Sequence, residues 1–274
     1  MARYRTMAVA NGRYIFLLGG LDATGSTVDT VYRIDPGRGA TKPAGTLAAP
    51  THGGAAVQLA GGAYVFGGAG PPVYDLVQRY DPTSGHTGVA GHLPSPRADL
   101  AAAAVGNKVV VAAGFDGVGP LDTVLATSDE RDFRPLAHLP RAVRYPAVAV
   151  VGRSVFLLGG LEAGGEYTGT FSRSIQRVSL VTGRASIVGN LPTSYAHAMA
   201  TVRDGQVFVL GGSTPAGASN AILRFNPATG RVSRAGTLPE HVADGGVATI
   251  GDTTYIVGGI NGGSLTAVCV VRIG

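Results

Sequence analysis

The chain repeats one short pattern six times: an apolar run that ends in two small residues. The second small residue of each copy recurs at intervals of 48, 46, 46, 52 and 47 residues in a sequence of 274 residues. The copies are IFLLGG (15–20), YVFGG (64–68), VVVAAG (109–114), VFLLGG (155–160), VFVLGG (207–212) and YIVGG (255–259). Repeats of about 40 to 50 residues are typical of propellers and solenoids, in which each unit buries its apolar face against the next.

Each repeat is predicted to contain four antiparallel strands. The apolar runs are short, rich in β-branched residues and bounded by glycine, which indicates strands. A two-residue turn such as Asn11-Gly12 precedes each run, and a strand of small residues precedes that turn. A third strand ends in a turn such as YDPTSG (80–85), and a fourth ends in Leu-Pro or Leu-Ala. Six such units predict an all-β fold, a six-bladed β-propeller of four-stranded antiparallel blades.

The two ends of the chain are predicted to meet where the ring closes. Residues 4–18 are expected to form the first two strands of blade one, and residues 265–273 the third strand of blade six. No fourth strand for blade six is found at either end, so the last blade is predicted to lack its outer strand. The 265–273 edge would then be open to strand pairing with another chain. We expect either that the natural chain extends further or that a partner supplies the missing strand.

The composition excludes several classes of protein. No apolar run approaches the roughly 20 residues of a membrane helix, and the N-terminus has no signal-peptide core. The single cysteine permits no intrachain disulfide. The net charge of +5 is carried by 20 arginines and two lysines without a basic run, so no nucleic-acid track is predicted. The location stays open between the cytoplasm and a fragment of an extracytoplasmic protein.

The repeats resemble those of the kelch family over essentially the whole chain. The shared features are the glycine doublet, YDP at 80–82, and LPSPR at 93–97, where kelch repeats carry an L-x-x-P-R element. The resemblance implies that residues 1–274 form a single kelch-like β-propeller domain. The family usually has a tryptophan six residues after the turn aspartate, and this chain has no tryptophan. We therefore expect the packing between blades to differ in detail, with Phe133 as the nearest aromatic substitute.

Basic or imidazole residues follow the Leu-Pro-like elements, in the links between blades. In a closed ring they are predicted to surround the mouth of the central channel and to bind carboxylate, phosphate or sulfate groups, more strongly below about pH 6.5 where histidine is protonated. These candidates are Arg3, His52, Arg97, Arg144, His197 and His241. The other interpretation is structural, because kelch repeats commonly have an arginine here whose donors can bind loop carbonyls and join adjacent blades. Both interpretations stay open.

The loop between the second and third strands of blade four is the second candidate region. The 52-residue interval places an insertion there, and the loop carries Glu162, Glu166 and Tyr167. These acidic and aromatic groups would extend a ligand site on the same face as the links. The alternative is an ordinary solvated loop.

No catalytic motif or close His/Cys cluster is found, so no catalytic residue, metal site or cofactor is assigned. The leading hypothesis is a non-catalytic binding propeller that recognises an anionic or carbohydrate-like ligand, or an acidic peptide, over the central channel. A carbohydrate-active enzyme similar to the kelch-like sialic acid mutarotases is one alternative; it would use Glu162 or Glu166 with Arg97 or Arg144. A scaffold that recruits a protein partner is another.

Overall fold

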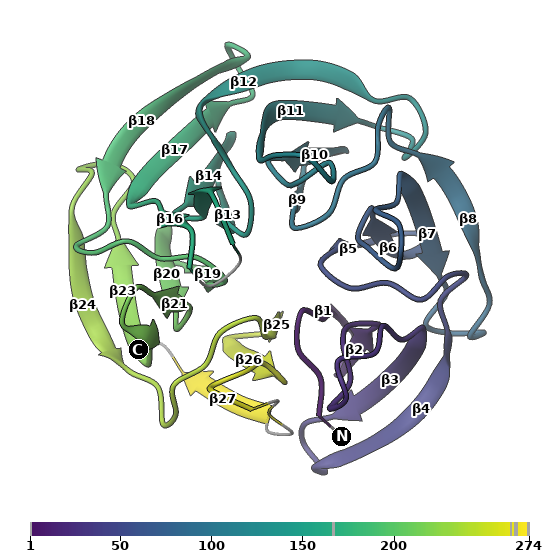
Figure 1. Ribbon diagram of the computed structural model, residues 1–274. Coiled ribbons are helices and arrows are strands. Elements are labelled where there is room, and N and C mark those ends of the chain that lie inside the picture. Colours follow the sequence, from purple (N-terminus) through teal and green to yellow (C-terminus); the bar gives the residue numbers. More distant parts are fainter. Residues whose placement is uncertain (1, 166–167, 264, 266–267, 273–274) are drawn as a thin grey trace.

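The computed structural model describes residues 2–165, 168–263, 265 and 268–272, and it shows six antiparallel sheets arranged around a central axis (Figure 1). The predicted six-bladed β-propeller is confirmed. The sheets of blades one to five each have four strands in sequence order from the axis outward, and the described residues of blade six form three. No helix is present among the described residues, so none is long and apolar enough to cross a membrane.

The innermost strand of each blade is rich in alanine, valine and glycine, and the second is strongly apolar. The innermost strands are β1 (Met7–Asn11), β5 (Ala55–Leu59), β9 (Ala101–Val105), β13 (Ala147–Val151), β19 (Met199–Arg203) and β25 (Gly246–Ile250). The second strands are β2 (Tyr14–Leu18), β6 (Gly62–Phe66), β10 (Lys108–Ala112), β14 (Ser154–Leu158), β20 (Gln206–Leu210) and β26 (Thr253–Val257). Small residues suit the crowded axis, and the second strands supply most of the buried core.

The outer half of each blade is more polar. The third strands are β3 (Thr30–Asp35), β7 (Leu76–Tyr80), β11 (Leu121–Thr127), β17 (Ser174–Ser179), β23 (Ala221–Phe225) and β27 (Val268–Arg272). The fourth strands are β4 (Ala40–Thr46), β8 (Thr87–His92), β12 (Arg134–Val143), β18 (Arg184–Asn190) and β24 (Val232–Thr237). Two short hairpins extend the loops of blades four and five: β15 (Leu161–Ala163) with β16 (Thr170–Phe171), and β21 (Ser213–Thr214) with β22 (Gly217–Ala218).

The ring closes between blade six and blade one, where β25 lies beside β1 (Figure 1). Residues 4–18 supply the first two strands of blade one as predicted, although the inner strand begins only at Met7. β27 pairs with β26 as the third strand of blade six. Among the described residues β27 is the outermost strand of blade six.

The glycine doublets allow each blade to approach the next. The second residue of each doublet donates its backbone N–H to a carbonyl of the link that follows its blade, as Gly160 does to Tyr195 at 2.7 Å. The last such bond runs from Gly259 to Arg3 and closes the ring. A Cβ on the first glycine, for example Gly159, would overlap the same Tyr195 carbonyl. Glycine is therefore required by close backbone approach as well as by its positive φ of 69°.

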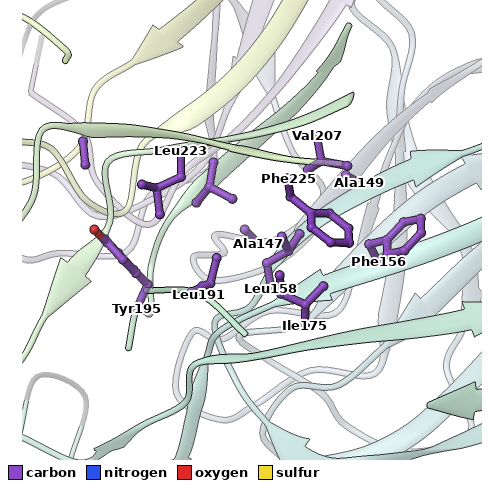
Figure 2. Close-up of a cluster of buried hydrophobic side chains, with 12 residues drawn as sticks. Ala147, Ala149, Phe156, Leu158, Ile175, Leu191, Tyr195, Val207, Leu223 and Phe225 are labelled. Atoms are coloured by element: carbon purple, nitrogen blue, oxygen red, sulfur yellow. The ribbon is translucent and has the colours of Figure 1, made fainter. Parts of the chain in front are cut away.

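The core lies between neighbouring blades, and the interface between blades four and five is representative (Figure 2). Phe156 of β14 meets Phe225 of β23 edge-on, with ring centroids 5.5 Å apart. Leu191, which follows the fourth strand, is fully buried beside Ile175. Phe133 packs edge-on against Phe66, at 6.2 Å. Aromatic pairs of this kind fill the space between blades in a chain without tryptophan.

Candidate ligand-binding site at the channel mouth

Six residues in equivalent positions surround one end of the central channel. Each lies in the link before an inner strand and donates its backbone N–H to the carbonyl of the preceding member, over 2.6–3.1 Å. The bond from Arg5 to the Asp244 carbonyl completes a closed circle of six hydrogen bonds. We call this set the mouth ring: Arg5, Gly53, Asp99, Tyr145, His197 and Asp244. The circle fixes six backbone positions, one from each blade, around the axis.

All members of the mouth ring have positive φ, between 50° and 59°. This left-handed conformation costs a non-glycine residue on the order of 1 kcal/mol. At the first doublet position, which also has positive φ, glycine occurs in five blades and Ala113 in the sixth. At the mouth ring the preference for glycine is absent, because Gly53 is the only glycine among its six members. Five strained positions thus carry side chains with functional groups, an arrangement common at binding and catalytic sites.

One half of the mouth is organised by Asp99. Its carboxylate, almost fully buried, lies 3.4 Å from a guanidinium nitrogen of Arg5 and 3.7 Å from one of Arg144. Arg5 also reaches the face of Tyr145 on the opposite side of the ring, with its guanidinium carbon 4.9 Å from the ring centroid. The side chains therefore extend across the channel axis instead of pointing away from it.

The other half is built on His197 and Asp244. The His197 Nδ1 atom lies 2.7 Å from a carboxylate oxygen of Asp244, and the imidazole is completely buried. The ring of Tyr145 stacks on the imidazole with centroids 3.9 Å apart. A carboxylate hydrogen-bonded to one ring nitrogen fixes the orientation of a histidine.

A cavity of about 140 Å³ lies among these groups. It is lined by the mouth ring and by the residue that follows each member. Counting full charges, Arg5 and Arg144 are balanced by Asp99 and Asp244, so the mouth is close to neutral when His197 is neutral and gains one positive charge when it is protonated. The site offers both hydrogen-bond donors and acceptors at close range.

Arg97 and Arg3 lie two residues before the mouth ring. The Arg97 guanidinium is buried and donates to the Ala113 carbonyl at 2.9 Å, and to the carbonyl and hydroxyl of Thr123 at 3.0 and 2.7 Å. Its own carbonyl accepts from Gly68, so this arginine connects blade two to blade three. Burial lowers the pKa of Arg97 to about 10, which leaves it charged at neutral pH. Arg3 is also buried, with its guanidinium over Tyr32.

The other candidates from the links occupy three further positions. His52 and Arg144 lie one residue before the mouth ring; His52 Nδ1 is 2.9 Å from the Thr27 hydroxyl. Arg144 donates to the Gly164 carbonyl and reaches the mouth through Asp99. His197 is a member of the mouth ring, and His241 is exposed, three residues before Asp244. The six predicted residues therefore do not form one ring: only His197 lines the cavity.

The blade-four loop is described only in part. Glu162 forms an ion pair with Arg141 at 2.9 Å, on the rim of the propeller face. Glu166 and Tyr167 lie outside the described residues. Loop acids elsewhere on this face stabilise turns: Asp22 accepts hydrogen bonds from Thr24 and Ser26, and these bonds lower the pKa of its carboxyl group.

Five residues of the mouth ring are absent from the candidates of the sequence analysis: Arg5, Gly53, Asp99, Tyr145 and Asp244. A signal for them exists, because every member of the mouth ring lies 15 residues before the second small residue of its doublet. The predicted residues were selected by charge, and they lie 15 to 18 residues before that position. Strict repeat register, applied without regard to residue type, would have found the mouth ring.

Within the described part of the chain, no group of three or more His, Cys, Asp or Glu side chains is close enough to hold a metal ion. The candidate site therefore consists of hydrogen-bonding, ionic and aromatic groups.

Comparison of the sequence with known protein families gives no match, and comparison with curated proteins gives none either. Many solved structures share the fold. One of them, described as the structure of YjhT, aligns with a TM-score of 0.83 over 100% of this chain and 95% of that chain, at 16% sequence identity. At this identity the likeness establishes the six-bladed propeller fold and nothing about the ligand.

Proposed function

We propose that this protein is a ligand-binding propeller whose site is the mouth of the central channel. The observation that carries the proposal is the set of five strained, non-glycine residues that bring charged, imidazole and phenol groups from five blades around one cavity. Strain of this kind persists where the surrounding structure over-determines it, and it clusters at functional sites.

The charge balance favours a carbohydrate-like ligand over a simple anion. Asp99 and Asp244 line the mouth as hydrogen-bond acceptors and Arg5 lines it as a donor, so a ligand with several hydroxyl groups meets both kinds of partner. A single negative charge, as in a sugar acid, is also compatible, because the Arg5 guanidinium lines the mouth cavity. Phosphate or sulfate alone would face Asp99 and Asp244 at close range.

A thermal-shift screen tests the proposal with neutral sugars, sugar acids, phosphate and sulfate at pH 5.5 and 7.5. A ligand that binds only the native state must raise the melting temperature. We expect the shift caused by the best sugar to be lost in Asp244→Asn and kept in Asp22→Asn, a matched change in an accessible loop of the same face. If Asp244→Asn keeps the thermal shift, the mouth is not the binding site. The side-chain contacts within the mouth ring would then have only a structural role.

A second candidate is an enzyme of the mutarotase type, which the His197–Asp244 pair favours. Interconversion of sugar anomers requires a base that removes the proton of the anomeric hydroxyl and an acid that protonates the ring oxygen as the ring C–O bond breaks. A histidine oriented by a carboxylate is suited to such proton transfers. Glu162, paired with Arg141, is a weaker candidate for the acid.

Anomer exchange distinguishes these two functions. A pure anomer is dissolved with the protein, and its conversion is followed by NMR or polarimetry. An enzyme would accelerate the exchange, and His197→Gln would lower that acceleration by about 10²-fold or more while the sugar still binds. Binding with no acceleration in the wild-type protein would favour the non-catalytic function.

We also propose that the repeats are kelch repeats and that β27 is a site for strand pairing. The glycine doublets and the YDP turn support the first proposal. The position of β27 as the outermost described strand of blade six supports the second, because the outer edge of a sheet presents backbone groups to another chain. A protein-recruiting function would use this edge and would leave the mouth free.

A further inference from the structure

A second cavity of about 180 Å³ is lined by side chains that are apolar except for Thr6. It shares six lining residues with the mouth cavity, so the two cavities adjoin. The shared residues are those that directly follow the mouth ring: Thr6, Gly54, Leu100, Pro146, Ala198 and Gly245. With the exception of the Thr6 hydroxyl, these residues present no polar side-chain group to the space below the mouth.

The lining also includes Met7, Met199 and Gly246, and one position further along each inner strand it consists of alanine and valine. Three residues after each member of the mouth ring, the inner strands contribute Ala8, Ala56, Ala102, Val148, Ala200 and Val247. Five of these six are half-buried although they face the axis of the propeller, which indicates that side chains do not fill the lumen at this level. The channel thus combines a polar mouth with an apolar interior.

We propose that the ligand of the mouth is amphipathic, with a hydroxyl-rich head at the mouth ring and a short alkyl, acyl or phenyl substituent in the channel. The nature of the head rests on the proposed function; the apolar subsite rests on the channel alone. An apolar cavity of about 150 Å³ accommodates benzene, so about 180 Å³ suffices for a substituent of that size. A head without such a substituent would leave the apolar side chains of the channel as hydrated as in the free protein, so the channel would contribute nothing to binding.

The experiment measures the affinities of 1-alkanols, from ethanol to 1-hexanol, by ligand-observed NMR. Their apolar chains probe the channel without depending on the identity of the sugar. In the wild-type protein we expect the affinity to rise about fourfold for each added methylene, the equivalent of about 0.8 kcal/mol, until the chain fills the cavity.

Two variants fill the channel from different blades: Ala200→Leu and Ala56→Leu. Each adds a branched side chain at the apolar level and should abolish the dependence on chain length. Ala104→Leu is the matched control, because Ala104 lies on an inner strand but is exposed and does not line the cavity. It should behave as the wild type does.

The outcomes separate this inference from the proposed function. Affinity that is independent of chain length, or a dependence unchanged in both filled variants, overturns the apolar subsite even if sugars stabilise the protein through Asp244. A chain-length dependence that the filled variants abolish supports the subsite. If no sugar then causes a thermal shift, the head group must be revised and the channel subsite remains.

Discussion

Replacing Gly159 with alanine should destabilise the propeller by several kcal/mol, although it adds a single methyl group. Gly159 has a φ of 69°, and a Cβ there would overlap the carbonyl oxygen of Tyr195 in the next blade. That carbonyl also accepts the hydrogen bond from Gly160 at 2.7 Å. The methyl group would therefore push apart two blades at one of their backbone connections.

The expected magnitude is the sum of three effects. Left-handed φ costs alanine about 1 kcal/mol, overlap with packed backbone about 1–3 kcal/mol, and a weakened hydrogen bond about 0.5–1.5 kcal/mol. We expect a loss of about 2.5–5.5 kcal/mol in the free energy of unfolding. The control is Gly152→Ala, because Gly152 has a similar φ of 58° with no atom within 4 Å of the added Cβ. It should lose only about 1 kcal/mol.

Urea unfolding of the wild type and of both variants measures these losses in the free energy of unfolding. The comparison is valid when the free energy falls with urea concentration at the same slope in all three proteins. Equal losses in the two variants would refute the argument from close backbone approach. Blade three shows how such a result could arise, because it has an alanine, Ala113, at the equivalent position with a φ of 62°. If blade four accommodates a methyl group as blade three does, glycine there would be explained by φ alone.

Three further predictions concern the blades. Asp81→Asn should keep its turn, as Asn226 does in blade five, but lose a pH-dependent contribution: hydrogen bonds lower the pKa of Asp81, so its stabilisation is present above about pH 4 and disappears as the pH falls through the folded-state value. The difference between wild type and variant in urea unfolding should therefore decrease between about pH 6 and pH 2.5, and a constant difference would contradict this. Arg97→Lys should lower the free energy of unfolding by about 2–4 kcal/mol, because an ammonium group cannot replace three directed hydrogen bonds, while leaving any sugar-induced thermal shift intact. Val270→Lys, on the outermost described strand β27, should reduce concentration-dependent self-association in analytical ultracentrifugation; a wild-type protein that is monomeric at all concentrations would argue against self-pairing.

The fold could be predicted from the sequence because the strands, the turns and the buried positions all recur with the same repeat. The intervals between doublets, the turns before β2 and β20, and the buried leucine that follows β4, β8, β18 and β24 all come from one unit that must pack against its copy. The described residues of blade six form three strands, as the repeat register predicts.

The candidate site could be predicted only in part, because residue type and repeat position select different residues as members of the site. Arg97 has the charge of a ligand-binding residue, yet its guanidinium binds the backbone of blade three. Asp99, two residues later, lines the mouth cavity. A side chain with left-handed φ points in a direction that charge patterns do not reveal, so the convergence of Arg5, Asp99 and Tyr145 appears only in three dimensions.

The most direct test of the mouth as the binding site is a crystal structure of the protein with the sugar that gives the largest thermal shift. We predict that the sugar occupies the end of the channel, with hydroxyl groups within hydrogen-bonding distance of Asp99 or Asp244. A sugar bound elsewhere, with the mouth ring unchanged and its side chains still paired across the axis, would contradict the account.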